Sequence, residues 1–472
     1  MANVLLIEPN TKYSFDKRWV RTHLGLLYLA SSLEMKKNYV KFLPQPLLNF
    51  NLEYLQKFIR KYRIDLIGIS SLTANYNETI KIVNHLHNNF KHLKFVLGGC
   101  HPTYYTENIL KKFPFISCVV RKEGEITFPK VISAIESNKS LKNIDGIAYI
   151  KGKEIIVNKD SILHENLDNI PLPARHIIPM YIYKRINPEA HILCSRGCFG
   201  NCTFCTIPDF FGKKIRFRSV ENIIYEIELI LKKYKFNRIK FEDCVFTFNK
   251  QHLFLLCDEI IRRNLKFSWR IQTRLDKIDR EIITRIAKAG CREILIGIES
   301  VTDRIANKLY HKKINLNCFK DILKFAEEKK INIFPSFIVG APDESFEEAM
   351  KTINFAKGIY IKLNRNPRIS YLTPFPGTMF FEKYLKDKHD NIEIEGNDFD
   401  KFSQHIPILK TSKMNIKELA RLWAISCRDI VFSDCNKLNY YLKENNCNRY
   451  ISPKIFIYKF KEFEIKKNKE KI

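Results

Sequence analysis

Two series of alternating apolar and polar segments run along the chain and predict two α/β domains. In the first series, short apolar runs such as Val4–Ile7, Leu66–Ser70 and Cys118–Val120 are separated by segments with helical spacing such as Leu52–Tyr62. A short continuous apolar run is typical of a strand that is buried on both faces of a parallel sheet. Residues 1–145 are therefore expected to form a doubly wound domain whose ligands bind at the carboxyl ends of the strands.

The second series begins near Ala190 and alternates strand segments with helical ones. Its strands are fewer than the eight of a complete (β/α) barrel, so the pattern predicts a partial (β/α)6 barrel with its active site at the carboxyl ends of the strands. The strand segments are Ile192–Leu193, Arg238–Phe241, Ser268–Gln272, Glu293–Ile298, Ile333–Val339 and Arg368–Leu372.

Two further segments complete the predicted organisation. Residues 146–185 hold a hairpin around Gly152 and then a proline-rich connector between the domains. Proline lacks a backbone donor and disfavours helix in the residue before it, so the connector is expected to be extended. The barrel is assigned to residues 186–385, and residues 386–472 are expected to form a small, mostly helical C-terminal part.

The composition is that of an ordinary globular protein. Apolar residues make up 45% and charged residues 28% of the 472 residues. No run approaches the roughly 20 apolar residues that cross a bilayer, and the N-terminus lacks the basic and long apolar regions of a signal peptide. We therefore expect a cytoplasmic protein without a transmembrane segment.

The net charge is strongly positive, since 80 Lys and Arg residues against 51 Asp and Glu residues give +29. Such an excess is compatible with nucleic acid, an anionic membrane surface or acidic partners, but the abundance of Lys throughout the chain favours a general compositional bias. The chain lacks recognisable RNA-binding modules, so no nucleic-acid partner is expected. An acidic electron donor such as a flavodoxin or ferredoxin would be steered by the positive charge.

Four of the 13 cysteines, Cys194, Cys198, Cys202 and Cys205, lie close together just after the first strand of the second series. The last three have the spacing C-x3-C-x2-C, and three thiolates in one loop hold three irons of a cubane cluster. The fourth iron then stays open for a small molecule, as redox chemistry on a bound substrate requires. A zinc site with Cys194 as the fourth ligand and a ferredoxin-like electron carrier are the alternatives.

The segment Ser195–Cys205 resembles the signature of radical S-adenosylmethionine (SAM) enzymes. The resemblance implies a [4Fe–4S] cluster with Cys198, Cys202 and Cys205 as its ligands and Cys194 as a bystander. In that superfamily SAM chelates the open iron, and one electron cleaves it to a 5′-deoxyadenosyl radical. Residues in the cysteine loop and at the ends of the later strands match positions that hold SAM in the family. These candidates are Phe204, Glu242, Asp243, Arg274, Glu299, Ser300 and Gly340.

The first domain resembles the Rossmann-like cobalamin-binding domain that is fused to radical SAM barrels. Small residues and glycines follow its strands, where they let a large ligand approach the backbone. The Asp-x-His-x-x-Gly motif, by which many cobalamin proteins supply a histidine to cobalt, is absent, so that loop is not expected to provide a cobalt ligand. The cobalamin candidates are Ser70, Leu72, Gly98, Gly99, His101, Glu123 and Gly124.

Together the resemblances imply a cobalamin-dependent radical SAM methyltransferase of class B. One SAM would methylate reduced cobalamin, and a second would generate the radical that abstracts hydrogen from an unactivated carbon, which then takes the methyl group. The alternative is a radical SAM cyclase or carbon–carbon coupling enzyme in which cobalamin has another role or is absent. An RNA-binding metal protein is a third, weaker hypothesis. The substrate is expected to be a small molecule, a lipid, a tetrapyrrole or a peptide.

Overall fold

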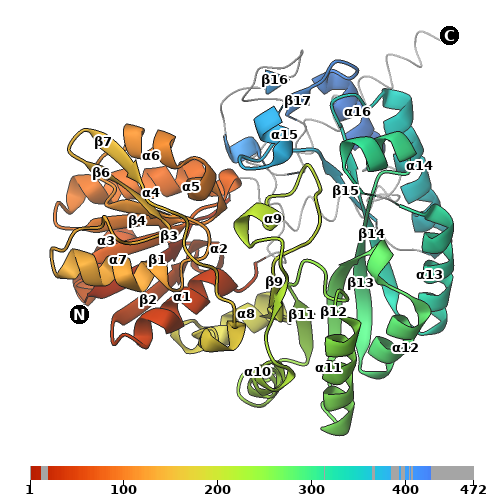
Figure 1. Cartoon of the computed structure of the whole chain (residues 1–472), viewed down its shortest axis with the longest axis horizontal. Helices are drawn as coiled ribbons and strands as arrows, with labels where there is room; N and C mark the ends of the chain where they lie inside the picture. The colour runs from red at the N-terminus through yellow and green to blue at the C-terminus, as the bar shows by residue number, and fades with distance from the viewer. Residues whose placement is uncertain are drawn as a thin grey trace.

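The computed structural model describes residues 2–11, 20–312, 314–363, 367–383, 393–394, 399–402, 404 and 408–426. Two sheets lie side by side, one built from the N-terminal third of the chain and one from its middle (Figure 1). In the described part of the chain, no helix is both long and apolar enough to span a membrane. The predicted helical C-terminal part lies mostly outside the described residues, which include α16 (Ile416–Ser426).

The first sheet is the predicted doubly wound sheet with an added edge. Within the described residues it has seven strands in the order β2-β1-β3-β4-β5-β6-β7, and β1 to β5 are parallel. The hairpin of β6 and β7, which we expected between the domains, pairs antiparallel with β5 and forms the edge of this sheet. The strands are β1 (Asn3–Glu8), β2 (Tyr39–Pro44), β3 (Leu66–Ser70), β4 (Lys94–Gly98), β5 (Cys118–Val120), β6 (Ile147–Lys151) and β7 (Glu154–Val157).

Helices cover both faces of the first sheet. Val4 and Leu6 of β1 belong to one hydrophobic core, and Leu5 and Ile7 belong to a second. Because successive side chains of a strand point to opposite faces, this arrangement accounts for the continuous apolar runs in the sequence. The helices are α1 (Leu24–Glu34), α2 (Gln45–Leu48), α3 (Leu52–Tyr62), α4 (Tyr76–Asn89), α5 (Cys100–Tyr104), α6 (Thr106–Lys112) and α7 (Thr127–Glu136).

The connector between the sheets is only partly extended. Two 3₁₀ turns, Leu167–Asn169 and Arg175–Ile177, interrupt it, and α8 (Met180–Ile186) follows. Ile170 and Ile178, which each precede a proline, are extended as predicted. Neither 3₁₀ turn contains a proline, so the expectation of extended backbone was wrong for these two turns. Arg175 is fully buried, and its Nη1 lies 2.5 Å from Oε1 of Glu226, so the connector is anchored to a barrel helix.

The second sheet is the predicted partial barrel. Its described strands are parallel and follow the order β15-β14-β13-β12-β11-β8. A short antiparallel pair, β9 (Ser195–Arg196) and β10 (Arg216–Phe217), lies between the two sheets (Figure 1). The barrel strands are β8 (Ala190–Ile192), β11 (Arg238–Phe241), β12 (Ser268–Arg274), β13 (Cys291–Glu299), β14 (Asn332–Val339) and β15 (Arg368–Tyr371).

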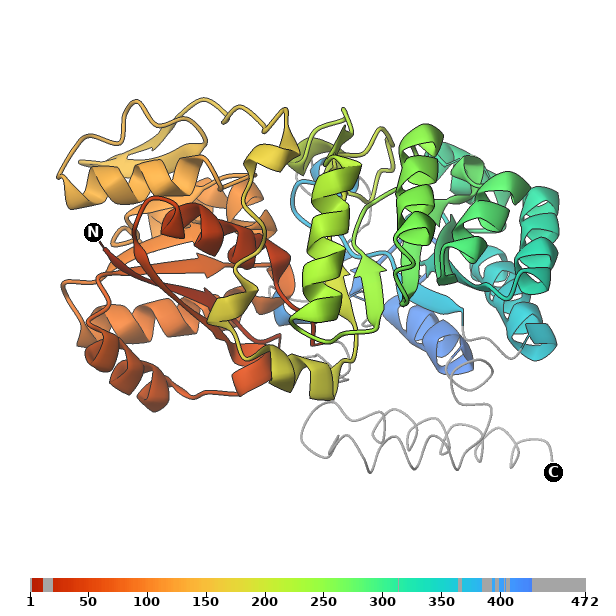
Figure 2. The same ribbon diagram turned by 90° about the horizontal axis from the view of Figure 1, so that it is seen from below.

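Helices follow one side of the barrel sheet (Figures 1 and 2). Helices α10 to α13 each begin after a residue whose side chain accepts a hydrogen bond from the first turn, namely Ser219, Asn249, Asp279 and Asn315. The remaining elements are α9 (Ile207–Phe210), α10 (Val220–Lys232), α11 (Lys250–Arg262), α12 (Arg280–Lys288), α13 (Leu316–Glu328), α14 (Phe346–Leu363), α15 (Met379–Phe381), β16 (Glu393–Ile394) and β17 (Leu409–Lys410).

Candidate active site

The three predicted cluster cysteines lie on one loop between β9 and β10. Gly197 opens the loop with a φ of 104°, and a Cβ at this position would fall 2.3 Å from the carbonyl oxygen of Lys214. Only glycine tolerates such a backbone. The N–H of Cys205 donates to the carbonyl of Cys202 at 3.1 Å, which closes a turn between these two cysteines.

The thiols of this loop fit the donor set of a cluster. A Cβ on Gly200 would lie 3.4 Å from Sγ of Cys198 and 3.8 Å from Sγ of Cys202, and Nη1 of Arg274 lies 3.8 Å from the latter. Burial raises the pKa of the Cys202 thiol and raises that of Cys205 to about 12, so metal binding would displace these protons. Among the described residues, no three His, Cys, Asp or Glu side chains lie close enough together to hold a metal ion. Ligation by the three cysteines therefore stays a prediction, which the three thiols of one loop support.

Asp243, a SAM candidate, holds the start of the cysteine loop. Its Oδ1 accepts from Oγ of Ser195 at 2.5 Å, and its Oδ2 accepts from the N–H of Cys194 at 3.1 Å. Burial raises the pKa of Asp243 to about 6. The thiol of Cys194 is also buried, and burial raises its pKa well above the usual value, as suits a bystander. The predicted contact of Asp243 with SAM stays untested.

A polar layer that sequence analysis missed lies on the inner face of three barrel strands, β8, β11 and β12. His191, Lys240 and Arg270 are neighbours in register across β8, β11 and β12. The SAM candidate Glu242 accepts from Lys240 at 2.7 Å and lies 2.8 Å from Nδ1 of His191, while Arg270 donates to Glu189 at 2.8 and 2.9 Å. Although burial opposes ionisation, His191 and Lys240 lower the pKa of Glu242. The signal was present in the alternation of charged and apolar residues within these strands.

Glu299 and Ser300 lie where β13 ends, and both are buried. Glu299 has a φ of 63°, which is uncommon for a residue with a side chain. Its carboxylate accepts from Nζ of Lys312 at 2.6 Å, and Oγ of Ser300 lies 3.3 Å from Oγ1 of Thr352. An unusual backbone at the carboxyl edge of a barrel supports a functional position, and the SAM contact stays a prediction.

Phe204, a further SAM candidate, and Ile338, two residues before the candidate Gly340, both contact the buried Tyr310. Phe204 meets Tyr310 edge to face, with ring centroids 5.2 Å apart, and the hydroxyl of Tyr310 donates to the carbonyl of Ile338 near the end of β14. Gly340 follows this strand, and its N–H donates to Oε2 of Glu344 at 2.7 Å. Burial raises the pKa of Glu344 to about 7. The cysteine loop and the end of β14 are thus packed on one another.

The carboxyl edge of the first sheet brings backbone and small side chains together. Gly99 has a φ of 93°, and a Cβ there would fall 2.7 Å from the carbonyl oxygen of Ser71 and 3.0 Å from Oγ of Ser70. The N–H of Ser71 donates to the carbonyl of Gly98 at 2.8 Å, which joins the ends of β3 and β4. Leu72 is 43% exposed beside them. This edge fits a large ligand that contacts backbone and apolar surface.

His101, a cobalamin candidate, lies beside that edge, and its N–H donates to the carbonyl of Ser71 at 3.2 Å. Its side chain is 1% exposed, and its ring packs against those of Tyr76, Tyr105 and Phe399, with centroids 4.3, 5.1 and 4.8 Å away. Its Nδ1 lies 3.2 Å from Oγ1 of Thr73, and burial lowers its pKa to about 3. Within the described residues, Nε2 of His101 is buried without a hydrogen-bond partner, and the predicted contact with cobalamin stays untested.

Glu123 forms ion pairs between the two domains. Its carboxylate lies 2.5 and 3.2 Å from the two terminal nitrogens of Arg216 on β10, and Glu125 lies 2.6 Å from Nη2 of Arg196 on β9. All four side chains are buried, and so is Gly124 between the two glutamates. Glu123 and Gly124 therefore lie where the first domain holds the strands that flank the cysteine loop. Sequence analysis missed this role because both arginines lie far along the chain.

Tyr104 of α5 makes a second bridge between the domains. Its hydroxyl donates to Oδ2 of Asp209 on α9 at 2.8 Å. Its ring lies against Gly377, where a Cβ would fall 2.3 Å from the ring. Since α5 starts directly after Gly99, the carboxyl edge of the first sheet contacts the segment just after the third cysteine.

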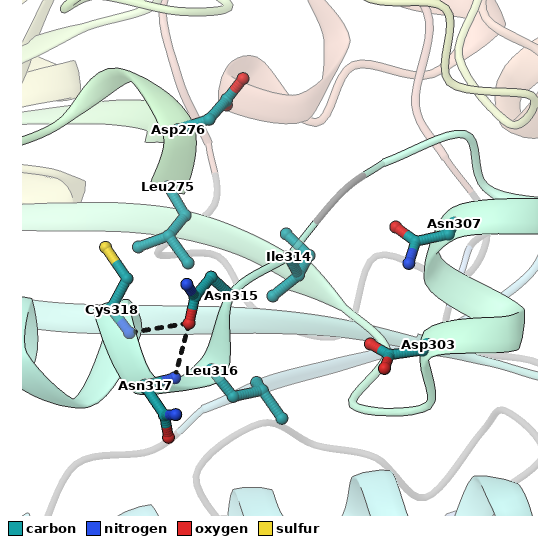
Figure 3. Close-up of a pocket in the computed structure, with 9 residues that line it drawn as sticks. All are labelled: Leu275, Asp276, Asp303, Asn307, Ile314, Asn315, Leu316, Asn317 and Cys318. Carbon is teal, nitrogen blue, oxygen red and sulfur yellow. Dashed lines mark hydrogen bonds between the residues drawn. The ribbon is translucent and has the colours of Figure 1, made fainter.

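A cavity of about 650 Å³ lies on another part of the barrel edge (Figure 3). It lies between the end of β12, the segment after β13 and the start of α13. None of the predicted site residues lines it, although Asp276 also accepts hydrogen bonds from Arg274. The lining residues are Leu275, Asp276, Asp303, Asn307, Ile314, Asn315, Leu316, Asn317 and Cys318.

Two segments of the chain match known families. Residues 192–356 match the radical SAM superfamily, and residues 21–132 match the B12 binding domain. An uncharacterized methyltransferase of Pyrococcus horikoshii is 30% identical over 426 residues, which cover 89% of this chain and 91% of that protein. The chain belongs to the radical SAM enzymes that carry a B12-binding domain. Its cofactors are accordingly a [4Fe–4S] cluster, SAM and cobalamin, as the sequence predicted.

Two further similarities agree with this family. The anaerobic magnesium-protoporphyrin IX monomethyl ester cyclase of Cereibacter sphaeroides is 27% identical over 380 residues, which cover 78% of this chain and 60% of that protein. The structure of the cobalamin-dependent SAM radical enzyme OxsB with aqua-cobalamin and SAM bound superposes with a TM-score of 0.75 at 18% identity, covering 91% of this chain and 67% of that chain. The likeness to OxsB confirms the predicted fold class. The zinc and electron-carrier alternatives do not account for these matches.

Proposed function

We propose that this enzyme transfers a methyl group from SAM to an unactivated carbon of a polar substrate. The observation that carries the proposal is the contact between the two carboxyl edges, in which Tyr104 after β4 donates to Asp209 after the cysteine loop. A methyl donor on the first domain and a radical source at the cysteines must act on one carbon atom, so their two sites have to adjoin.

The residues of this chain would bind and shield the cofactors. When bound, the cluster with SAM supplies a 5′-deoxyadenosyl radical, and cobalamin carries the methyl group. Cys198, Cys202 and Cys205 would hold the cluster, and the backbone around Gly99 would lie against the corrin. The buried pair of Glu123 and Arg216 keeps charged groups out of water at the junction, which supports a closed site.

The polar layer of the barrel narrows the substrate class. His191, Lys240 and Arg270 line the inner face of the sheet, where substrates of such barrels reach the carboxyl edge. Polar side chains are suited to a substrate with charged or hydrogen-bonding groups. Among the expected substrates, the layer favours a polar small molecule, a tetrapyrrole with carboxylates or a peptide over a lipid. An acidic flavodoxin or ferredoxin as electron donor and a cytoplasmic location remain part of the proposal.

The test is to follow the methyl group. Anaerobically reconstituted enzyme with a reductant, hydroxocobalamin and SAM carrying a deuterated methyl group is incubated with a small-molecule extract of the source organism. We expect a product that gains the labelled methyl, together with S-adenosylhomocysteine and 5′-deoxyadenosine, by mass spectrometry. The cyclase alternative, which the magnesium-protoporphyrin relative favours, predicts 5′-deoxyadenosine and a changed product without label. That outcome would replace the methyltransferase proposal.

A further inference from the structure

Arg274, at the end of β12, points its guanidinium at the cysteine loop. Its Nη1 lies 3.8 Å from Sγ of Cys202, within hydrogen-bonding distance for sulfur. The same nitrogen is 3.5 Å from the position that a Cβ would take on Gly200. The charged group is therefore packed against the turn that carries two of the three cluster cysteines.

The orientation of this guanidinium is fixed by its other neighbours. Asp276 accepts from Nε of Arg274 at 2.8 Å and from Nη2 at 3.2 Å. The ring of Phe199, inside the cysteine loop, lies 5.2 Å from Cζ of Arg274. The side chain of Arg274 is 14% exposed. With two nitrogens bound to Asp276 and one face on an aromatic ring, Nη1 is the group that stays directed at Cys202.

A hydrogen bond from a cation to a cluster sulfur changes the redox balance of the cluster. Reduction adds negative charge to the cluster and its thiolates, and a nearby N–H and positive charge stabilise that state more than the oxidised one. We propose that Arg274 is a positioning residue that donates to the ligand sulfur of Cys202 and makes the cluster easier to reduce, with Asp276 holding it in place. The inference rests on the proposed ligation by Cys202.

The chain offers a graded set of variants for the test. Asp276 is 43% exposed and borders the cavity of about 650 Å³ in Figure 3, so Asp276→Asn fits without repacking a core. Lys277 provides the matched control, because its Nζ lies 5.2 Å from the same Phe199 ring. Lys277→Gln removes one positive charge beside the loop and leaves the hydrogen bond of Arg274 in place.

The experiment is a redox titration of the reconstituted, SAM-free enzyme, followed by the electron paramagnetic resonance (EPR) signal of the reduced cluster, with iron and sulfide contents measured in parallel. At a fixed solution potential, we expect Arg274→Gln to lower the ratio of reduced to oxidised cluster about tenfold, which is ~59 mV for a one-electron couple. We expect Arg274→Lys to change it less, Asp276→Asn to shift it about threefold in the same direction, and Lys277→Gln to stay near wild type.

Three outcomes would overturn the inference. The first is an unchanged potential in Arg274→Gln, or a shift no larger than in Lys277→Gln. The second is an unshifted potential together with weaker SAM binding in a separate equilibrium titration of Arg274→Gln, which would make Arg274 a SAM contact. The third outcome applies if Arg274→Gln fails to load iron. In that case an unshifted potential in both Arg274→Lys and Asp276→Asn overturns the inference. Loss of iron and sulfide from the wild-type enzyme as well would instead refute the proposed function.

Discussion

The two parallel sheets of this chain differ in what covers them. In the first sheet, Leu66 packs into one core and Ile67 into the other, so both faces are closed by helices. In the barrel sheet, Ile239 packs outward into a core while Lys240 joins a polar layer on the opposite face. A sheet closed on both faces offers a ligand only its edge, whereas a half-open barrel offers an edge and a face.

This difference explains where the candidate chemistry lies. The edge of the first sheet, around Gly99 and Ser70, consists of backbone and small side chains, which suits contact with a large rigid ligand. The edge of the barrel holds cysteines and buried charged groups such as Glu299, which suit a cluster and a charged small molecule. The pairs between Glu123 and Arg216 and between Tyr104 and Asp209 join the two edges.

Substitution of one cluster cysteine is expected to have the largest effect and to affect the barrel edge alone. We expect Cys202→Ala to reduce iron and sulfide contents and SAM cleavage to background, while hydroxocobalamin binding at the first edge is retained. Cys194→Ala is the control, because its buried thiol makes no part of the proposed site. The zinc alternative predicts the reverse for Cys194, namely that its loss also releases the metal.

The closed faces of the first sheet should tolerate less truncation than the open face of the barrel. Ile67 is fully buried, so we expect Ile67→Ala to cost about 3 kcal/mol of stability through lost burial and an unfilled cavity. Gln272, on the inner face of β12, is half-buried, and Gln272→Ala should cost less than about 1 kcal/mol. Native-state hydrogen exchange of β3 and β12 measures each domain separately. Equal costs at the two positions would contradict the comparison.

The buried ion pairs between the domains should hold the cysteine loop. Removing one partner of a buried pair leaves a charge uncompensated, so Glu123→Ala should cost about 3 kcal/mol, and amide exchange in β9 and β10 should quicken. Glu165 pairs with Lys214 nearby, but both side chains are more than 70% exposed. Glu165→Ala should change neither stability nor exchange measurably. If Glu123→Ala and Glu165→Ala changed stability and amide exchange equally, burial of the Glu123–Arg216 pair would not account for its contribution.

A Gly-to-Ala substitution at the carboxyl edge of the first sheet is expected to weaken cobalamin binding and to leave the iron content of the cluster unchanged. Gly99→Ala introduces a Cβ 2.7 Å from the carbonyl of Ser71 at a positive φ, a strain of about 1–2 kcal/mol. We expect hydroxocobalamin affinity to fall about tenfold in equilibrium titrations, with iron content unchanged. Gly358→Ala in α14, where a Cβ meets nothing within 4 Å, is the control. Unchanged affinity in Gly99→Ala would remove this edge as the cobalamin site.

Much of the fold and the cysteine motif could be predicted because both depend on residues that are close together in the sequence. The run Leu66–Ser70 and the helix Leu52–Tyr62 need only their own spacing to be recognised, and the structure has both within the same bounds. The C-x3-C-x2-C motif spans eight residues, and the glycines that shape its loop lie beside it.

Long-range pairings could not be predicted in the same way. Glu123 lies 93 residues from Arg216, and Tyr104 lies 105 residues from Asp209, so nothing local identifies either partner. The hairpin around Gly152 was recognised, but its addition to the first sheet depends on the free edge of β5. The burial of His101 could not be predicted either, because two of the three aromatic rings that pack around it come from distant parts of the chain.

The central claim is that the cobalamin edge and the cluster loop adjoin in one enzyme. Pulsed EPR of enzyme that holds both cob(II)alamin and the reduced cluster tests it most directly. The account predicts two paramagnetic centres per chain, with a dipolar coupling that disappears in Cys202→Ala. Uncoupled signals, or a metal content of zinc without inorganic sulfide, would contradict it.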